Sequence, residues 1–310
     1  MDARELIRQH FRPSRLVRAD SISSRVGADV FLKLESELPT GAFKVRGALY
    51  TLSLQMQRRS VTEVVAHSTG NHGAAVAFAA RALGVKATIF LPRDPNPVKR
   101  AKIAALGAKV SEQGADSAEA FEAASAYAAS TGAFLLNDAT DPDLPAGPAT
   151  IADEIFDELA EADAIYVPVG DTALIRGVGA RAKVLRPNIR IIGVQAERAP
   201  SYTLSWRAGS VVSTETCDTI ADGLATRLPA EANVQTIRQL VDDMRLVTDD
   251  EILSAIALLL TEEHLVVEPA GAATTAAVLK EPQTERRRTL VLLVTGSNIA
   301  PDVLRRAAAR

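Results

Sequence analysis

Cysteine, basic charge and long apolar segments are all scarce in this sequence. Its single cysteine, Cys217, cannot form an internal disulfide. The longest apolar runs, 256–260 and 290–294, are far shorter than the ~20 residues of a membrane helix. No basic stretch followed by an apolar one opens the chain, as a secretory signal would require. These absences predict a soluble protein of a reducing, cytoplasmic compartment.

A basic excess is also missing. The chain has 35 lysine and arginine residues against 38 aspartate and glutamate residues, which gives a formal net charge of −3. Without positive charge in excess, attraction to nucleic acid or to anionic membranes is weak. We therefore expect the partner to be a small molecule or a second copy of the chain. A length of 310 residues, 47% of them hydrophobic, predicts a globular protein of about two domains.

Short apolar runs alternate with alanine-rich segments of helical period. This alternation is typical of an α/β protein with a largely parallel sheet. The expected strands are 64–66, 87–91, 134–136, 164–169, 189–195, 245–247 and 290–294. The helical pattern predicts one helix over 71–83 with Gly84 as its C-cap, and another that ends at Leu106. A third begins at Thr248, which can form a capping box with Glu251.

Lys44 stands out because the chain has only eight lysines against 27 arginines. It lies between two glycines and beside Phe43, in a segment that matches neither a clean helix nor a clean strand. Burial would disfavour its ammonium form, and a neutral amine is the nucleophile that Schiff-base chemistry requires. The alternative is a solvated loop lysine, since lysine is rarely buried.

A strand around 64–66 runs into a polar turn that opens the helix expected at Asn71. Free backbone N–H groups at a helix start, with the side chains of Ser68, Thr69 and Asn71 around them, make a pocket suited to a carboxylate. The same side chains can equally cap the helix, and both interpretations rest on the same physics.

A later segment again has the pattern of strand, tight turn and helix. Gly170 permits a sharp turn, the amides of residues 171–174 can point at an anion, and Thr172 adds a hydroxyl, as in a phosphate cradle. Because a carboxylate repels a phosphate, the side chain of Asp171 must turn away, cap the helix or pair with Arg176. The alternative is an ordinary connection capped by aspartate or threonine.

The apolar strand 290–294 ends in Thr295. Ligands of open α/β sheets bind beyond the carboxyl ends of the strands, so this hydroxyl is well placed to meet a ligand. A plain strand-ending turn is the alternative.

Other chemistries lack their motifs. His67 and His72 have no cysteine or histidine partner at metal-ligand spacing, which predicts no metal site. A G-x-S-x-G hydrolase motif is missing, and the turn at Gly170 is not the G-x-G-x-x-G of dinucleotide-binding proteins.

Five segments together resemble the fold-type II pyridoxal-phosphate enzymes, in the threonine/serine dehydratase and serine racemase branch. The most specific segments are TGAFKVRGA at 40–48 and STGNHG at 68–73, supported by DGLA at 222–225, EPAG at 268–271 and TGSN at 295–298. The resemblance extends from Phe31 to Asn298. It implies a two-domain α/β fold similar to the β subunit of tryptophan synthase, each domain an open, mostly parallel sheet flanked by helices.

The resemblance also implies a domain division and a site. Residues 53–141, which hold three strand–helix units, would form a small substrate-loop domain, and 1–52 with 142–310 a large cofactor-binding domain. The cofactor is expected to be pyridoxal 5'-phosphate, with Lys44 as the Schiff-base lysine and catalytic base. The implied cofactor-binding residues are Phe43, Lys44, Asn71, Gly170, Asp171, Thr172, Ala173, Leu174, Gly223, Glu268 and Thr295. The implied substrate-binding residues are Ser68, Thr69, Gly70, Asn71 and His72.

The implied activity is β-elimination from a small β-hydroxy amino acid such as L-threonine or L-serine, giving a 2-oxo acid and ammonia. Thr295 would meet the pyridine nitrogen, and a neutral hydroxyl there makes the ring a weaker electron sink, which favours elimination over transamination. Serine or aspartate racemisation, or dehydration of a modified hydroxy amino acid as in hydroxyectoine breakdown, remains an alternative. A cofactor-binding protein without activity is a further one. The family also implies a homodimer.

The sequence departs from the family pattern at several positions. Residues 170–174 read GDTAL where relatives usually have a run of glycines, which indicates a distinct subgroup. Ala42 replaces a usual serine, and Thr69 stands where racemases carry the serine that reprotonates the opposite face. The region after Glu197 lacks the second acidic ligand of metal-dependent relatives, so we expect no metal requirement.

Overall fold

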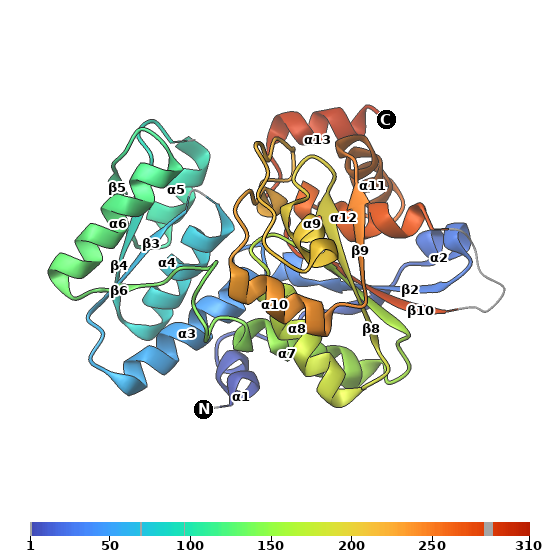
Figure 1. The fold of residues 1–310 in the computed structure, drawn as a ribbon, viewed down its shortest axis with the longest axis horizontal. Coiled ribbons are helices and arrows are strands. Elements are labelled where there is room, and N and C mark those ends of the chain that lie inside the picture. The colour runs from blue at the N-terminus through green and yellow to red at the C-terminus, as the bar shows by residue number, and fades with distance from the viewer. Residues whose placement is uncertain (1, 69, 96, 282–287) are drawn as a thin grey trace. The chain divides into compact units, whose positions relative to one another are not determined.

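The computed structural model describes the chain except for residues 1, 69, 96 and 282–287. Contacts divide it into two compact units. Unit 1 comprises Met1–Arg12 and Leu38–Gly147, and unit 2 comprises Pro13–Glu37 and Pro148–Arg310. Each unit contains its own sheet (Figure 1).

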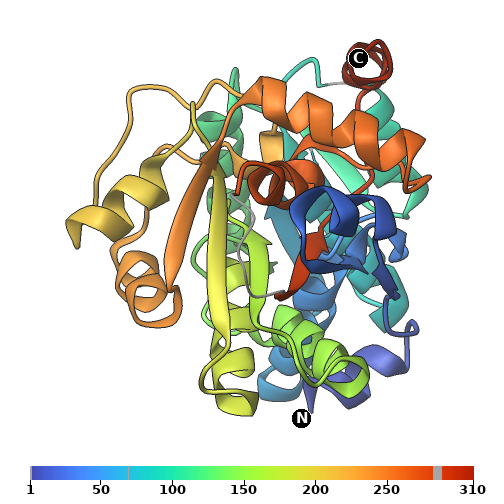
Figure 2. The same ribbon diagram turned by 90° about the vertical axis from the view of Figure 1, so that its right-hand side faces the viewer.

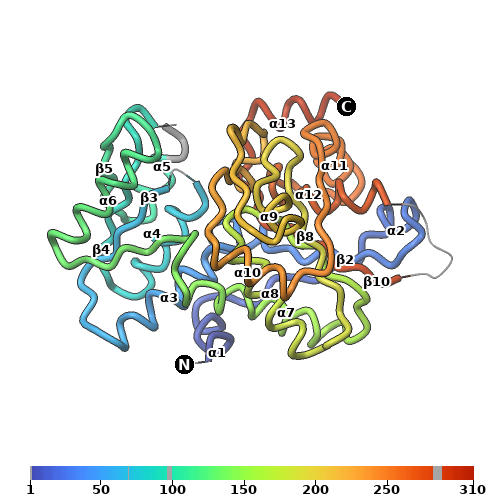
Figure 3. The backbone as a smooth tube through the Cα atoms, viewed as in Figure 1, coloured from blue at the N-terminus to red at the C-terminus, as the bar shows by residue number. Residues whose placement is uncertain are grey.

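Unit 1 contains a four-stranded sheet in the order β5-β4-β3-β6, with every described neighbour pair parallel. Its strands are β3 (Glu63–His67), β4 (Lys86–Leu91), β5 (Lys109–Glu112) and β6 (Phe134–Leu135). Its helices are α1 (Ala3–Arg8), α3 (Lys44–Arg58), α4 (Asn71–Leu83), α5 (Pro97–Ala105) and α6 (Ser117–Thr131). The tube in Figure 3 shows how strands and helices alternate along this part of the chain.

Unit 2 contains a six-stranded sheet in the order β1-β2-β10-β7-β8-β9, in which only the pair of β1 and β2 is antiparallel among the described strands. Its strands are β1 (Leu16–Arg18), β2 (Asp29–Leu34), β7 (Ala164–Pro168), β8 (Arg190–Ala196), β9 (Asp243–Val247) and β10 (Thr289–Val294). Figure 2 shows β8 and β9 side by side.

Eight α-helices and two short 3-10 turns accompany this sheet in the described residues. The helices are α2 (Asp20–Val26), α7 (Ala146–Glu158), α8 (Ala173–Leu185), α9 (Ser201–Ala208), α10 (Glu231–Leu240), α11 (Asp249–Thr261), α12 (Pro269–Leu279) and α13 (Pro301–Ala308). The turns are η1 (Glu35–Glu37) and η2 (Asp222–Leu224). None of the described helices is both long and apolar enough to cross a bilayer.

The core of unit 2 forms around β7, β10 and α12. All five residues of β7 are buried, as expected of a central parallel strand covered on both faces. Helix α12 starts with proline at its first position, a place where the missing N–H has no consequence. Its small residues are buried along nearly the whole helix, which lets it pack closely against β10 and β7.

The expected strands and the α/β class are confirmed. Helix α4 ends at Gly84, whose φ of 70° is left-handed, and Thr248 and Glu251 form the capping box at the start of α11. Strands β1, β2 and β5 were not anticipated, because short strands with mixed polarity give little periodic signal. The irregular conformation expected around Lys44 is wrong, since this residue starts the 15-residue helix α3.

The contact-based units differ from the expected domains in three segments. Residues 1–12, 38–52 and 142–147 group with the smaller sheet rather than with the larger one, and the second of these segments includes Lys44. The reason is packing, because α3 lies against α4 within unit 1. The division into a cofactor-binding and a substrate-loop domain remains a prediction about function.

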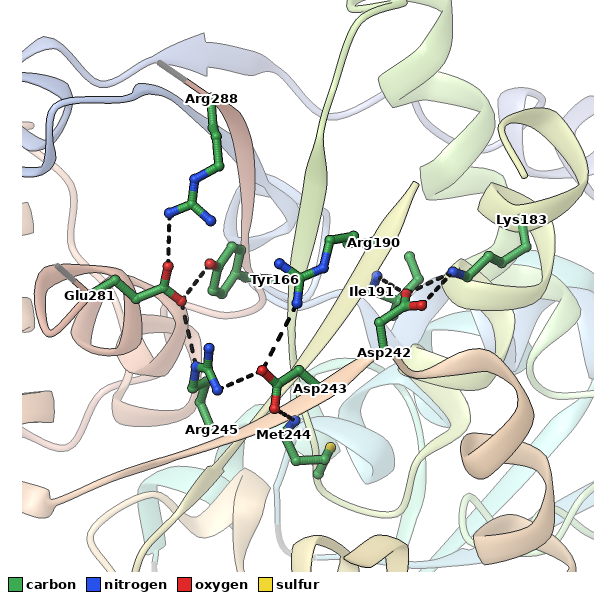
Figure 4. Close-up of polar contacts among 10 residues, drawn as sticks. All are labelled: Tyr166, Lys183, Arg190, Ile191, Asp242, Asp243, Met244, Arg245, Glu281 and Arg288. Carbon is green, nitrogen blue, oxygen red and sulfur yellow. Dashed lines mark hydrogen bonds and ion pairs between the residues drawn. The ribbon is translucent and has the colours of Figure 1, made fainter. Parts of the chain in front are cut away.

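A charged network lies where β9 and β10 begin (Figure 4). The hydroxyl of Tyr166 donates to Glu281 Oε1 at 2.6 Å, and Arg288 and Arg245 contact the same carboxylate at 3.0 and 3.5 Å. Arg245 also pairs with Asp243 at 2.6 Å. Burial and the bond to Glu281 raise the pKa of Tyr166, so the phenol stays protonated. This network is at the opposite end of the strands from the site described below.

A buried ion pair joins β2 to α7. Lys33 Nζ lies 2.7 Å from Glu154 Oε2, and the two side chains are 0% and 3% exposed. The Lys33 ammonium also donates to the Ser14 carbonyl oxygen at 2.6 Å. Removing one member of such a pair leaves a buried charge without its counter-charge.

We expect Lys33→Met to lower the free energy of unfolding by about 3–5 kcal/mol, because Glu154 would remain buried and charged. The double variant Lys33→Met/Glu154→Leu should recover most of that loss. Urea denaturation followed by circular dichroism measures both. The control is Lys280→Met, whose pair with Glu251 is 44% and 33% exposed and contributes less than about 1 kcal/mol. Equal losses in Lys33→Met and the control would contradict the expectation.

Candidate active site

Lys44 is held at the start of α3 by an ion pair. Its Nζ donates to Asp138 Oδ2 at 2.5 Å and lies 5.8 Å from the centre of the Phe43 ring. The side chains of Lys44 and Asp138 are 24% and 23% exposed, so both can be reached from solvent. Of the two interpretations of Lys44, the partly exposed side chain favours the accessible lysine over the buried neutral amine. The amine is partly exposed, and a carboxylate stabilises its ammonium form.

Lys44 and His72 approach Asp138 from two helices. Burial would by itself raise the pKa of this carboxyl, but His72 and Lys44 outweigh it and hold the pKa well below its usual range. His72 Nδ1 is 3.8 Å from Asp138 Oδ2, while His72 Nε2 lies 3.0 Å from the Leu136 carbonyl oxygen. A carbonyl only accepts, so Nε2 carries a proton. Asp138 is thus a carboxylate at neutral pH.

The site prediction from sequence missed Asp138. The residue lies just beyond β6, which pairs with β3 in parallel. Carboxyl ends of adjacent parallel strands lie at one edge of the sheet, and the segment 68–70 leaves that edge from β3. Asp138 belongs to none of the five segments that carry the family resemblance. The strand order, which the sequence does not supply, brings it to the site.

The polar turn after β3 is built by Ser68 and Gly70. The amide of Gly70 donates to Ser68 Oγ at 3.1 Å, and Gly70 is the N-cap of α4. A Cβ on Gly73 would lie 2.4 Å from the Ser68 carbonyl oxygen, so only glycine permits this close turn. No side chain of the described residues caps α4, which leaves its first amides oriented for an anion. Thr69 lies outside the described residues.

In unit 2, the loop after β7 depends on close backbone contact. A Cβ on Gly170 would lie 2.2 Å from the Gly223 carbonyl oxygen, so the two backbones meet there. Thr172 has a φ of 70°, a left-handed conformation in which a β-branched residue is strained, and α8 begins immediately after it. The backbone at Thr172 thus has a conformation that glycine adopts more easily, although this residue is not glycine.

The Asp171 carboxylate has a polar contact beside this loop, and an arginine lies near the same turn. Its Oδ1 accepts from Thr226 Oγ1 at 3.3 Å, and this contact directs the carboxylate toward Thr226. Arg176 Nε donates to Thr172 Oγ1 at 3.1 Å, and Arg176 Nη2 is buried with no hydrogen-bond partner in the described part of the chain. Burial lowers the pKa of Arg176, against the opposing effects of Tyr202 and Asp171. A positive charge therefore lies against the turn.

Thr295 and Glu268 lie beyond the end of β10, next to β7 in the sheet. Thr295 is 3% exposed, and Glu268 is the N-cap of α12. The Glu268 amide donates to the Gly296 carbonyl oxygen at 3.0 Å, and a Cβ on Gly296 would lie 2.2 Å from Glu268 Oε1. These contacts bring the two segments together at the edge where the turn at Gly170 also lies.

The predicted site residues thus form two sets, each assembled within one unit. Unit 1 holds Phe43, Lys44, Ser68, Gly70, Asn71 and His72. Unit 2 holds Gly170, Asp171, Thr172, Ala173, Leu174, Gly223, Glu268 and Thr295. The second set fits a phosphorylated ring compound, because a tight turn at a helix start, an arginine with an unpartnered nitrogen and a buried hydroxyl are what such a ligand needs. The described residues contain no group of three or more metal-ligating side chains.

Comparisons with known proteins agree with this fit. A family model described as "Pyridoxal-phosphate dependent enzyme" matches residues 7–296. An L-threonine ammonia-lyase of Thermotoga maritima is 35% identical over 261 residues, which are 84% of this chain and 65% of the relative. An L-threo-3-hydroxyaspartate ammonia-lyase of Saccharomyces cerevisiae is 33% identical over 84% of this chain and 79% of the relative. The chain thus matches just under two thirds of the length of the Thermotoga relative.

The fold is also shared with solved structures. That of maize serine racemase matches with a TM-score of 0.92 at 29% identity, over 99% of this chain and 94% of the other.

We expect Arg176→Gln to lower the affinity for pyridoxal phosphate about tenfold, because the variant removes a positive charge beside the predicted phosphate loop. Affinity for pyridoxal, which has no phosphate, should not change. Absorbance titration of the cofactor-free protein measures both dissociation constants. Arg181→Gln is the control, since Arg181 lies on the same helix and pairs with Asp153 instead. An equal loss of affinity for both ligands would show that Arg176 does not act on the phosphate.

Proposed function

The chain belongs to the pyridoxal-phosphate dependent enzyme family, and on that premise we propose that it eliminates the β-hydroxyl of a small hydroxy amino acid such as L-threonine or L-serine. The products would be a 2-oxo acid and ammonia. The observation that carries the proposal is the position of Lys44. Its amine is partly exposed and shares Asp138 with His72, which follows the polar turn at the start of α4.

The residues of unit 2 would hold the cofactor. The amides of residues 171–174 and the charge of Arg176 suit its phosphate, and the hydroxyl of Thr295 suits its pyridine nitrogen. Asn71 of unit 1 would meet the ring hydroxyl. When bound, the cofactor supplies an electron sink for the α-carbon of the substrate.

Lys44 would act as the base that takes the α-proton. Proton uptake turns its amine into an ammonium, and Asp138 Oδ2 at 2.5 Å stabilises that charge. The same carboxylate would orient the lysine while its amine is not bonded to the cofactor. The substrate carboxylate would bind at the amino end of α4, where Ser68, Gly70 and Asn71 shape the turn.

Racemisation is a second candidate. It is supported by the likeness to maize serine racemase, which extends over nearly the whole of both chains. The same lysine would serve both reactions, so the two candidates differ in the fate of the substrate after its α-proton is lost.

We also propose that the enzyme is a cytoplasmic homodimer that acts on a small-molecule substrate. The family suggests the dimer. The single cysteine and the weakly acidic composition support a reducing compartment without nucleic acid as partner.

We expect rapid release of a 2-oxo acid from L-threonine or L-serine when pyridoxal phosphate is present. A coupled dehydrogenase assay measures the keto acid, and chiral chromatography measures D-serine in the same samples. Formation of D-serine without 2-oxo acid would favour racemisation. No reaction with either amino acid, despite a bound cofactor, would contradict both candidates for these substrates.

Lys44→Ala tests whether the lysine carries the chemistry. We expect turnover to fall at least about 1,000-fold, because the variant lacks the amine that is proposed to take the α-proton. Lys86→Ala, at the exposed start of β4, should keep normal turnover. Normal turnover in Lys44→Ala would exclude the proposed mechanism.

We expect the elimination to be unaffected by EDTA and not to increase with added Mg²⁺ at saturating cofactor. The reason is the missing second acidic ligand after Glu197. Rates measured after chelation and after addition of Mg²⁺ check this, and reproducible stimulation by the metal would contradict it.

A further inference from the structure

Asp138 forms an ion pair with Lys44, and the proposed reaction gives Asp138 no direct part in bond making. Lys44 must come within hydrogen-bonding distance of the α-carbon's proton, and Asp138 Oδ2 is 2.5 Å from the lysine nitrogen. The carboxylate therefore lies within about 6 Å of the reacting carbon. At that distance its charge acts on the β-substituent of a bound substrate.

Among the described residues, the titratable side chains that face Asp138 come from three elements. Lys44 lies at the start of α3, His72 in α4, and His67 at the end of β3. Burial lowers the pKa of His67 despite the opposing charge of Asp138, so this ring is neutral at pH 7 and does not offset the carboxylate. Lys44 supplies the positive charge of the ion pair with Asp138, and His72 Nδ1 lies 3.8 Å from the same carboxylate oxygen.

This balance changes when Lys44 is engaged in catalysis. As a base the lysine is neutral, so Asp138 keeps its negative charge while the ion pair with Lys44 no longer offsets it. A second carboxylate brought close by a substrate would meet an uncompensated like charge. A hydroxyl or another hydrogen-bond donor on the substrate could instead donate to the Asp138 carboxylate.

The two relatives named above differ in the charge of the substrate side chain, and this is the feature on which Asp138 would act. One acts on L-threonine and the other on L-threo-3-hydroxyaspartate, by their names. These two amino acids share the β-hydroxyl and differ at the next group, which is a methyl in one and a carboxylate in the other.

We propose that Asp138 determines substrate class by rejecting amino acids with an acidic side chain, so that the site takes neutral β-hydroxy amino acids. The assignment rests on the proposed function, because it takes Lys44 as the group that meets the α-carbon. Asp138 acts here as a specificity residue, through charge repulsion across the substrate.

The test compares the binding of L-asparagine and L-aspartate, which have the same shape and differ in side-chain charge. Both lack a β-hydroxyl, so binding is read from the absorbance of the bound cofactor without turnover. We expect the wild-type protein to bind L-asparagine at least about tenfold more tightly than L-aspartate. Asp138→Asn should bring the two dissociation constants within about threefold of each other.

Two further variants complete the design. Asp138→Ser removes the charge with a different side chain, so the result does not depend on how one substitution folds. Glu122→Gln removes an exposed carboxylate from α6 of the same unit and should leave the preference for L-asparagine unchanged. The ratio of kcat/KM for L-threonine to that for L-threo-3-hydroxyaspartate should fall at least about tenfold in both Asp138 variants.

The outcomes separate this assignment from the proposed function. If no hydroxy amino acid releases a 2-oxo acid but the asparagine preference disappears in the Asp138 variants, the reaction is wrong and the role of Asp138 is supported. An unchanged preference in both Asp138 variants, or a wild-type preference for L-aspartate, would overturn the role of Asp138 and leave the elimination reaction standing.

Discussion

Parallel strands end at the same edge of a sheet, and this constraint places the predicted site residues that directly follow strands. In unit 2, Gly170 and Thr295 follow the neighbouring strands β7 and β10, and Gly223 meets Gly170 through a backbone contact that tolerates no side chain. In unit 1, β3 and β6 are paired in the same direction, and this brings Asp138 to the edge from which the turn at Ser68 leaves. Helices that begin at such edges present unpaired amides, so anion-binding groups accumulate where the strands stop.

The charges around Lys44 determine the chemistry that its amine can perform. In the structure Lys44 is an ammonium paired with a carboxylate, and His72 supports the same carboxylate from α4. A lysine prepared by burial alone would be neutral at all times, whereas a lysine paired with Asp138 returns to a stable charged state after each proton transfer. The negative charge also has a consequence for the substrate, because it disfavours a second carboxylate nearby.

The loop that is predicted to bind the phosphate has a glycine-like backbone at a residue that is not glycine. Thr172 retains the left-handed φ that glycine would adopt without strain, and Arg176 bonds its hydroxyl. Asp171 adds a negative charge that a phosphate would oppose, and its contact with Thr226 directs it elsewhere. The positive charge of Arg176, which lies near the same turn, offsets the negative charge of Asp171. The unusual sequence thus changes the side chains of the loop and preserves its backbone.

The sequence by itself determined the α/β class, most strands, and the caps at Gly84 and Thr248. It also marked the segments around Lys44, Ser68, Gly170 and Thr295 as candidate parts of the site. These features follow from local periodicity, from capping chemistry and from short motifs, all of which are properties of neighbouring residues. Only the tertiary structure decided that Lys44 begins a helix and that Asp138, 94 residues away, is its partner. The order of strands in a sheet sets such contacts, and no local pattern in the chain encodes the edge at which two distant strands meet.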